Sequence, residues 1–177
     1  MFSDPESNLN RFDVQAGMHV VDLGAGSGFY TLALSRRVGP SGKVYAIDVQ
    51  KDLLEKLKKE ALKNHMMNIE VVWGNIEKIG GTKLKEGFVD RVVASNVLFQ
   101  IENEHRKNFV VEIKRILKQG GKVLVIDWSD SFSGMGPSQK LIVLPATAEA
   151  LFTKEGFKVE SDVSAGDHHW GIIFIKQ

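Results

Sequence analysis

The sequence has 177 residues, enough for one domain with a substantial core, and we expect a single domain over residues 1–177. Hydrophobic residues make up 43% and charged residues 25%, as in ordinary globular proteins, and a net charge of +1 argues against a dedicated nucleic-acid or membrane surface. The absence of cysteine excludes disulfides, thiolate metal sites and a cysteine nucleophile, and with no apolar run long enough for a bilayer we expect a cytoplasmic protein.

Helical and strand patterns alternate along most of the chain. In chain order we expect a helix over 4–12, a strand over 18–23, a helix over 28–38, a strand over 43–48, a helix over 51–64, strands over 69–73 and 88–94, a helix over 102–117 ended by Gly120 and Gly121, a strand over 122–127, a helix over 145–155, and strands over 157–163 and 170–176. The stretch 129–143 is the longest irregular segment.

Strands that alternate with helices indicate a parallel sheet covered by helices on both faces. Residues 157–163 and 170–176 are too close in the chain for a crossover helix, so they form a hairpin and the last strand runs antiparallel. Its unbroken apolar run from Ile172 to Ile175 places that strand inside the sheet. We therefore expect an α/β fold with a Rossmann-like, seven-stranded, mostly parallel sheet and an antiparallel C-terminal strand.

A glycine-rich turn, Gly24-Ala25-Gly26-Ser27-Gly28, follows the first expected strand and leads directly into a helix. Residues without a Cβ let the main chain approach a ligand closely. The N-terminus of the following helix offers unpaired N–H groups and a partial positive charge to an anionic group. This layout is typical of a nucleotide-type cofactor site.

Polar residues also follow the next three expected strands. Asp48 ends the second strand about 20 residues after the turn, where a carboxylate can accept both hydroxyls of a ribose. The third strand is followed by Gly74-Asn75-Ile76, whose amide can pair with an adenine edge, and the fourth by Ser95-Asn96. Because the carboxyl ends of parallel strands meet at one edge of a sheet, these residues and the turn form one candidate cofactor site.

The glycine spacing and Asp22 discriminate between cofactors. Dinucleotide sites have the pattern G-x-G-x-x-G, whereas this turn has G-x-G-x-G, and Phe29 stands where the third glycine is expected. Asp22 places a negative charge beside the turn, which would repel a pyrophosphate but suits a ligand with an ammonium group. S-adenosylmethionine carries an ammonium group and a sulfonium and no phosphate, so the pattern favours it over a nicotinamide cofactor.

The chain resembles a class I S-adenosylmethionine-dependent methyltransferase, in the broad group that includes the ubiquinone/menaquinone-biosynthesis-type enzymes. The resemblance runs nearly from end to end, over residues 20–28, 44–48, 73–77, 88–97, 117–127 and 156–157. It implies this fold and this cofactor, with S-adenosylhomocysteine as the product. It is far less informative about the methyl acceptor.

The resemblance also implies roles for individual residues. Asp22 and the turn would hold the methionine part, Asp48 would bind the ribose, and Ser95 would offer its carbonyl to the amine. Asn75 departs from the family pattern, in which aspartate is common, but an amide still donates and accepts. The implied cofactor-binding residues are Asp22, Gly24, Ala25, Gly26, Gly28, Asp48, Val49, Gly74, Asn75, Ile76, Ser95 and Asn96.

Methyl transfer from a sulfonium depends mainly on placing the nucleophile correctly, sometimes with a base, so catalytic residues are hard to predict. His168 and His169 open the last strand, whose start lies at the ligand end of the sheet. Either could act as a base near neutral pH, or serve as a structural anchor in a turn. No third ligand accompanies the pair, so we expect no metal. Residues 131–140 are a candidate lid, and Lys140 could hold an acidic substrate.

Balanced charge favours a small molecule as the acceptor. The fourth strand ends Ala94-Ser95-Asn96-Val97, without the two prolines and the aromatic residue typical of enzymes that methylate base or amide nitrogens. A protein or RNA methyltransferase is an alternative, because little of the chain roofs the site. A nicotinamide-dependent (NAD) oxidoreductase on a related fold and a non-catalytic S-adenosylmethionine-binding protein are further alternatives. A monomer and a homodimer are both compatible with the sequence.

Overall fold

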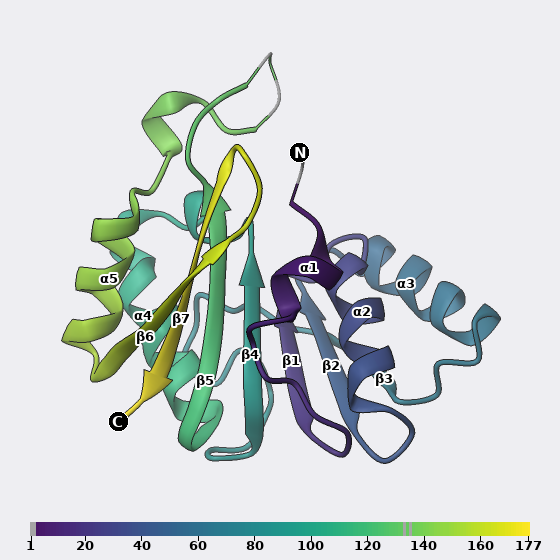
Figure 1. The fold of residues 1–177 in the computed structure, drawn as a ribbon. Coiled ribbons are helices and arrows are strands. Elements are labelled where there is room, and N and C mark those ends of the chain that lie inside the picture. Colours follow the sequence, from purple (N-terminus) through teal and green to yellow (C-terminus); the bar gives the residue numbers. More distant parts are fainter. Residues whose placement is uncertain (1–2, 133, 135) are drawn as a thin grey trace.

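The computed structural model describes residues 3–132, 134 and 136–177. In these parts of the chain, one sheet has the strand order β3-β2-β1-β4-β5-β7-β6 (Figure 1). The strands are β1 (His19–Leu23), β2 (Lys43–Asp48), β3 (Ile69–Trp73), β4 (Val89–Ser95), β5 (Leu117–Trp128), β6 (Phe157–Ser164) and β7 (His169–Lys176). The α-helices are α1 (Pro5–Leu9), α2 (Phe29–Val38), α3 (Lys51–Lys63), α4 (Asn103–Ile116) and α5 (Pro145–Lys154), and the short 3-10 helices are η1 (Leu98–Gln100) and η2 (Gln139–Leu141).

Strand directions in the sheet agree with the prediction. β1 pairs in parallel with β2 and β4, and β2 with β3 and β4 with β5 are parallel as well. β7 runs antiparallel between β5 and β6. Residues Trp170 to Phe174 of β7 are all buried, because a strand inside the sheet is covered on both faces. The Rossmann-like fold with an antiparallel, interior last strand is thus confirmed.

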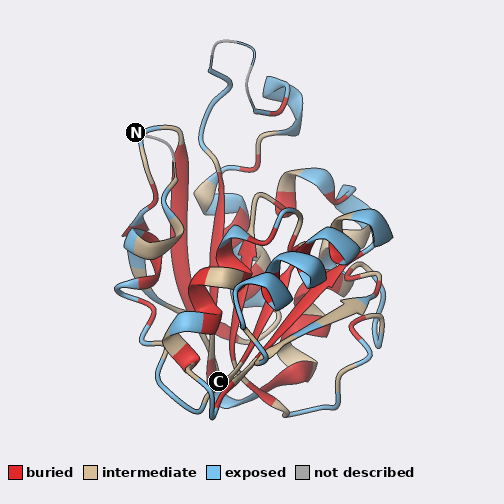
Figure 2. Cartoon of the chain, turned by 90° about the vertical axis from the view of Figure 1, so that its right-hand side faces the viewer, coloured by how far each residue is buried: buried red, intermediate tan, exposed pale blue. Residues whose placement is uncertain are grey.

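Helices cover both faces of the sheet, and each face has an apolar core. On one face, Phe109 of α4 and Phe152 of α5 are fully buried, and the Phe152 ring stacks on Phe174 of β7 with centroids 4.4 Å apart. On the other face, Leu34 of α2 and Leu57 of α3 pack against the strands. Figure 2 shows the strands largely buried and the outer sides of the helices exposed. No helix in the described residues is long and apolar enough to cross a membrane.

Some element boundaries differ from the prediction. The helix α4 ends at Ile116, one residue before its predicted end, but the stretch 117–121, expected to precede a strand over 122–127, already belongs to β5, because Leu117 has extended backbone angles (φ −71°, ψ 138°) and pairs with Val89. β5 therefore begins directly after the helix. α1 is also shorter than expected and ends at Leu9. Asp4 is its N-cap, and the Asp4 carboxylate accepts a hydrogen bond from the Ser7 amide at 3.0 Å.

The connection between β3 and β4 contains no helix in the described residues, and a buried carboxylate holds it in place. Glu112 of α4 is 1% exposed. Its two oxygens accept hydrogen bonds from the Gly80 amide at 2.7 Å, from Thr82, and from the Arg115 guanidinium at 2.8 Å. Burial alone would raise the pKa of Glu112, but the hydrogen bonds from Arg115, Thr82 and Gly80 outweigh it and lower the pKa to about 2.

Glu112→Gln should therefore lower the free energy of unfolding by about 3 kcal/mol near neutral pH, since it removes the negative charge that pairs with Arg115 and puts an NH2 donor where an acceptor oxygen faced the other donors. The folded pKa of about 2 lies below the ordinary value of 4.5, so the carboxylate stabilises the protein above that value and loses its contribution as pH falls toward 2. Urea unfolding at neutral and acidic pH measures both effects. Glu104→Gln, at an exposed position of the same helix, is the control and should change stability by less than about 0.5 kcal/mol.

The carboxyl ends of the parallel strands lie at one edge of the sheet, at the top of Figure 1. The hairpin places the start of β7 at this same edge, where His169 pairs with Trp128 at the end of β5. In open sheets of this type, ligands bind outside this edge. The strand ends that carry the predicted site residues therefore share the edge at which a ligand is expected.

Candidate functional site

The turn between β1 and α2 has an unusual backbone. Gly24, Gly26 and Gly28 all have positive φ, at 70°, 52° and 85°. The amides of Gly24 and Ala25 donate to the carbonyl of Ile47 at 2.8 and 3.0 Å, so the turn is held against the end of β2. Gly28 is the N-cap of α2 and makes no side-chain cap hydrogen bond, which leaves the first amides of the helix available to a ligand.

Two of these glycines leave room for a neighbouring side chain that packs against the backbone, and the third faces open space. A Cβ on Gly24 would lie 2.5 Å from Cγ2 of Val97, and one on Gly28 would lie 2.3 Å from Cδ1 of Leu57. A Cβ on Gly26 would meet nothing closer than a carbonyl oxygen at 3.8 Å. Gly26 therefore presents bare backbone to open space, as a turn that cradles a ligand requires.

Asp22 lies near the end of β1, two residues before the first glycine of this turn, and is 2% exposed. Its carboxylate accepts a hydrogen bond from the Thr31 hydroxyl at 2.6 Å. Desolvation raises the pKa of Asp22 to about 6, against the opposing effect of the Thr31 hydrogen bonds and with a further contribution from the nearby charge of Asp48. A cation bound beside Asp22 would favour the ionised carboxylate and offset this cost.

Asp48 joins the turn to the end of β2. One carboxylate oxygen accepts from the Gly26 amide at 2.9 Å, and the other accepts from the Gln50 amide at 2.8 Å. A carboxylate oxygen can accept more than one hydrogen bond, so both can still receive hydroxyl donors from a ligand. Asp48 thus orders the turn and remains able to bind a ribose.

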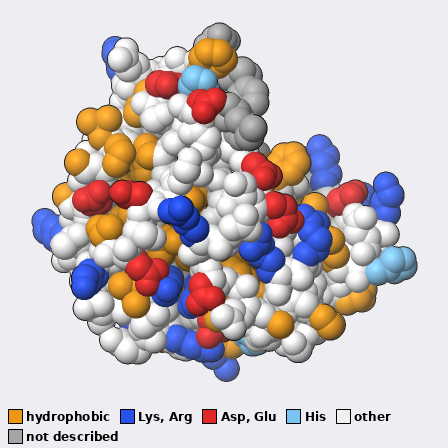
Figure 3. All heavy atoms as spheres, viewed as in Figure 1, with side chains coloured by type: hydrophobic (Ala, Val, Ile, Leu, Met, Phe, Trp, Pro, Cys, Tyr) orange, Lys and Arg blue, Asp and Glu red, His pale blue; other side chains and the backbone are white. Residues whose placement is uncertain are grey.

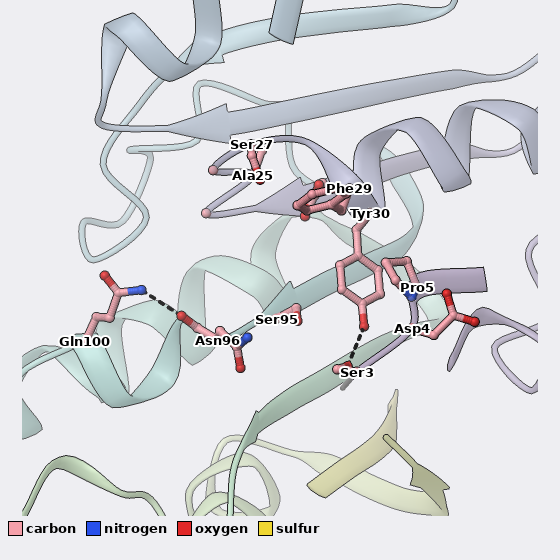
Figure 4. Close-up of a pocket in the computed structure, with 13 residues that line it drawn as sticks. Ser3, Asp4, Pro5, Ala25, Ser27, Phe29, Tyr30, Ser95, Asn96 and Gln100 are labelled. Atoms are coloured by element: carbon pink, nitrogen blue, oxygen red, sulfur yellow. Dashed lines mark hydrogen bonds between the residues drawn. The ribbon is translucent and has the colours of Figure 1, made fainter. Parts of the chain in front are cut away.

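A first cleft of about 610 Å³ lies over the ends of β1 and β4 and contains Asp22, Gly24, Ala25, Gly26, Ser95 and Asn96 of the predicted set. The sequence did not indicate which residues form its other wall; they include Ser3, Asp4 and Tyr30. The Tyr30 hydroxyl accepts from the Asn8 amide at 2.7 Å and lies 3.4 Å from the Ser3 hydroxyl, and Figure 4 shows Tyr30 pointing toward Ser3. The N-terminal segment is therefore fastened over the site.

A second, smaller cleft of about 160 Å³ adjoins the first and shares Gly24, Gly26 and Gln100 with it. The predicted residues Asp48, Val49, Gly74, Asn75 and Ile76 all line it. A Cβ on Gly74 would lie 2.4 Å from the carbonyl oxygen of Gly81, so this glycine also permits close packing of two backbone segments. The Asn75 side chain accepts from the Glu77 amide at 2.9 Å through its oxygen.

The end of β4 brings polar groups to the first cleft. Asn96 has a φ of 56°, and its side-chain oxygen is buried without a hydrogen-bond partner among the described residues. The Gln100 side chain donates to the Asn96 carbonyl at 2.7 Å, which ties η1 to this strand end (Figure 4). A buried oxygen without a partner indicates a donor that a bound ligand or water supplies.

The charge of the two clefts selects the kind of ligand. The first is lined by the carboxylates of Asp4 and Asp22, and the second by those of Asp48 and Glu77. No Lys, Arg or His is among the described residues that line either cleft. Such a site disfavours a pyrophosphate and suits a cationic nucleoside without phosphate. The carboxylates of the two clefts, the open backbone at Gly26 and the unpartnered Asn96 oxygen therefore fit S-adenosylmethionine.

The two predicted histidines lie beyond these clefts and line neither of them. His168 pairs through Nδ1 with Asp130 at 2.7 Å and stacks on Phe132. His169 is 8% exposed, and its ring lies 4.2 Å from the Trp128 ring between centroids. Neither ring nitrogen of His169 has a partner in the described part of the chain. Burial lowers the pKa of His169, and the nearby His168 lowers it further.

The candidate lid, 131–140, is described only in part, since Ser133 and Met135 lie outside the described residues. A Cβ on Gly136 would lie 2.8 Å from the Trp128 ring, so this glycine packs directly on the indole. Lys140 lines a separate cleft with Arg106. The structure therefore places Lys140 outside the first and second clefts.

Comparison with known proteins agrees with this geometry. The profile of a family described as a methyltransferase domain matches residues 14–166. The chain is 29% identical over 131 residues to a ubiquinone/menaquinone biosynthesis C-methyltransferase UbiE of Bordetella avium, covering 73% of this chain and 48% of the relative. It is 36% identical to a demethylmenaquinone methyltransferase of Lactococcus lactis, covering 68% and 46%. The chain thus spans about half the length of these curated relatives.

Among solved structures, a SAM-dependent methyltransferase from Aquifex aeolicus superposes with a TM-score of 0.88 at 29% identity, covering 99% of this chain and 91% of that one. A putative type 11 methyltransferase from Sulfolobus solfataricus superposes with a TM-score of 0.76 at 23% identity, covering 100% and 95%, which is a likeness of fold. The relationship to the first of these extends over nearly the whole of both chains.

Proposed function

The chain belongs to the class I S-adenosylmethionine-dependent methyltransferases, and on that premise we propose that it transfers a methyl group from S-adenosylmethionine to a small-molecule acceptor. The observation that carries the proposal is the pair of adjoining clefts lined by carboxylates and, among the described residues, by no cationic side chain. A nicotinamide dinucleotide would bring two phosphates to this surface, and so the oxidoreductase alternative is disfavoured.

Individual residues follow from this assignment. Asp22 binds the ammonium group of the cofactor, and the backbone of Gly24, Ala25 and Gly26 holds the methionine part. Asp48 accepts the ribose hydroxyls. The adenine lies in the second cleft, where Val49 and Ile76 supply apolar contact and the Asn75 amide faces the ring edge. Ser95 and Asn96 complete the site from β4.

The cofactor, when bound, supplies a methyl carbon activated by a positively charged sulfur, so the protein needs chiefly to place the acceptor in line with it. The first cleft, at about 610 Å³, has room for more than the methionine part. Ser3, Tyr30 and Asn96 bring hydroxyl and amide groups to the free part of this cleft. The relatives named for ubiquinone and menaquinone act on small molecules, which supports an acceptor of that size.

Binding and turnover are tested separately. Titration calorimetry should detect S-adenosylmethionine and S-adenosylhomocysteine binding and no binding of NAD. Methyl-labelled cofactor incubated with fractionated cell extract should then label the small-molecule fraction. Label found only in protein or RNA would show that the acceptor is a macromolecule. Binding of NAD without binding of S-adenosylmethionine would overturn the proposed methyltransferase function.

Both histidines lie beyond the two clefts, so a base there would serve an acceptor that extends past the first cleft to the start of β7. Of the two, His169 is the better proton acceptor. Its ring nitrogens have no partner in the described residues, whereas Nδ1 of His168 is bonded to Asp130. The lowered pKa keeps His169 neutral near neutral pH, the form that can accept a proton.

His169→Phe should accordingly reduce kcat by about a hundredfold, the scale of a lost general base, while the Kd for S-adenosylmethionine stays unchanged. The phenyl ring keeps the contact with Trp128, so the fold should be retained. Single-turnover rates with the labelled cofactor measure the effect, and His168→Phe is the matched comparison. An unchanged rate in the His169 variant would mean that the ring only packs against Trp128.

A further inference from the structure

A separate cleft of about 470 Å³ opens between the start of α4 and the segment that joins η2 to α5. We call it the α4–η2 cleft; it is formed by residues 99–103, Arg106, 140–144 and Thr147. Gln100 lines this cleft and also the first and second clefts. The α4–η2 cleft is therefore a neighbour of the proposed cofactor site, separated from it by η1.

Two cationic side chains of the α4–η2 cleft form no ion pair with any described residue, although the buried carboxylate of Asp127 acts on Arg106 through its charge. Arg106 uses Nε to donate to the Ile101 carbonyl at 3.0 Å, and its two terminal nitrogens have no hydrogen-bond partner among the described residues. Lys140 is exposed and, in the same part of the chain, makes neither a hydrogen bond nor an ion pair. Glu102 also lines the cleft, but it is exposed to solvent, which screens its charge.

The remaining walls of this cleft are largely apolar. Phe99, Ile101 and Ile142 line it, and Leu141 and Leu144 are 49% and 61% exposed. Figure 3 shows hydrophobic side chains gathered over the part of the surface where η2 leads into α5. A volume of this size is in the range of small-molecule pockets.

Charges are thus segregated between neighbouring clefts. The first and second clefts have carboxylates and no described cationic residue, while the α4–η2 cleft has, beside the exposed carboxylate of Glu102, two cations with donors to spare. An acceptor with an anionic group would be repelled from the carboxylates and attracted to Arg106 and Lys140. Guanidinium and ammonium groups are the usual protein partners of carboxylate and phosphate.

We propose that the α4–η2 cleft binds the anionic end of the methyl acceptor, a carboxylate or phosphate attached to an apolar body, with Arg106 and Lys140 as its ligands. The apolar body lies along Phe99 and Ile142 and directs the other end of the molecule past Gln100 toward the first cleft. This inference rests on the proposed function, because it takes the bound molecule to be the methyl acceptor. Binding of an amphipathic anion at the cleft can nevertheless be measured without turnover.

The probes are octanoate and octyl phosphate, with octan-1-ol as the uncharged comparison. The indole N–H of Trp170 donates to the Val143 carbonyl at 2.9 Å, next to the cleft, and its NMR signal reports on occupancy. Both anions should shift this signal in a saturable manner, and octan-1-ol should bind about tenfold more weakly or worse. Equal effects of all three probes, or none, would overturn the proposal; a response to one anion only would identify the head group.

Variants test the two cations. Arg106→Gln and Lys140→Gln should each weaken anion binding about tenfold, and Lys107→Gln, exposed on the same helix outside the cleft, should not. Lys140 is solvent exposed, so its variant is informative even if the Arg106 variant unfolds. If anion affinity is the same in the Lys140 and Lys107 variants, the cleft does not use Lys140 and the proposal is wrong.

Calorimetry with S-adenosylmethionine on the same samples separates this inference from the proposed function. Both cleft variants should bind the cofactor with wild-type affinity, and the labelled product from cell extract should be retained on an anion-exchange column. If the wild-type protein does not bind the cofactor, the proposed function alone is contradicted. Cofactor binding together with a neutral or cationic labelled product would contradict the anionic acceptor alone.

Discussion

Asp22→Asn should weaken S-adenosylmethionine binding about tenfold to a hundredfold, the scale of a charge-assisted hydrogen bond worth about 1.5–3 kcal/mol. The same substitution should raise the free energy of unfolding of the cofactor-free protein. An asparagine oxygen can still accept the Thr31 hydroxyl, which lies 2.6 Å from the carboxylate, but it carries no charge that must be buried. Opposite signs for affinity and stability mark a residue retained for binding.

The pH dependence of Asp22 follows from its raised pKa. Because the folded pKa of about 6 exceeds the ordinary value of 3.8, the folded state holds a proton that the unfolded state has lost between these values. Stability therefore falls as pH rises from 3.8 to about 6, by on the order of 2–3 kcal/mol. Asp127 is buried with a pKa that desolvation also raises to about 6, so it contributes in the same direction.

Cofactor affinity should have the opposite pH dependence, because the proposed partner of the ammonium group is the ionised form of Asp22. Calorimetry should show the affinity rising as pH increases through about 6, with proton release on binding below that value. The Asp22→Asn variant should lack this dependence. Asp162→Asn, at an exposed position on β6, is the control for removal of a carboxylate. If the Asp22→Asn variant is less stable than the wild type and binds S-adenosylmethionine with unchanged affinity, Asp22 has a structural role only.

The fold could be predicted because its signals are local. Apolar strand runs and helical periodicity each depend on neighbouring residues, and seven strands with a closing hairpin admit few arrangements. The antiparallel β7 followed from the short connection before it, and its interior place from the run Ile172 to Ile175. The start of β5, at Leu117 instead of at residue 122, was predicted wrongly because Gly120, which was expected to separate the helix from the strand, lies inside the strand with a φ of 71°.

The site could be predicted only where strand ends carry a recognisable residue. The clefts contain the turn, Asp48, Asn75 and Ser95 because the topology brings strand ends together. The residues Ser3 and Tyr30 of the first cleft's wall could not be predicted individually, since they depend on how the N-terminal segment crosses the sheet. Its hydrogen bond between Asn8 and Tyr30 joins residues 22 positions apart. Likewise, nothing near Glu112 in the sequence indicates that Thr82 is its partner.

Gly24→Ala should lower the free energy of unfolding by about 2–4 kcal/mol and weaken S-adenosylmethionine binding more than about tenfold. Two costs add at this position. The backbone has a φ of 70°, which an alanine adopts only with strain, and the new Cβ would lie 2.5 Å from Cγ2 of Val97. Val97 is buried and β-branched, so it has little freedom to move away. The turn must therefore shift, and with it the backbone of Gly26.

Two further variants separate these costs. Gly120→Ala has nearly the same φ, 71°, with nothing within 4 Å of the new Cβ, so it measures the backbone strain alone and should leave cofactor affinity unchanged. Val97→Ala removes the methyl groups that the new side chain meets, so the double variant with Gly24→Ala should be more stable than the sum of the single effects predicts. Strict additivity in urea unfolding would show that the contact with Val97 does not matter. The two alanine variants carry similar backbone strain, but only Gly24 lies between Asp22 and the ligand-facing Gly26. A larger loss of cofactor affinity in Gly24→Ala than in Gly120→Ala must therefore come from displacement of the turn itself.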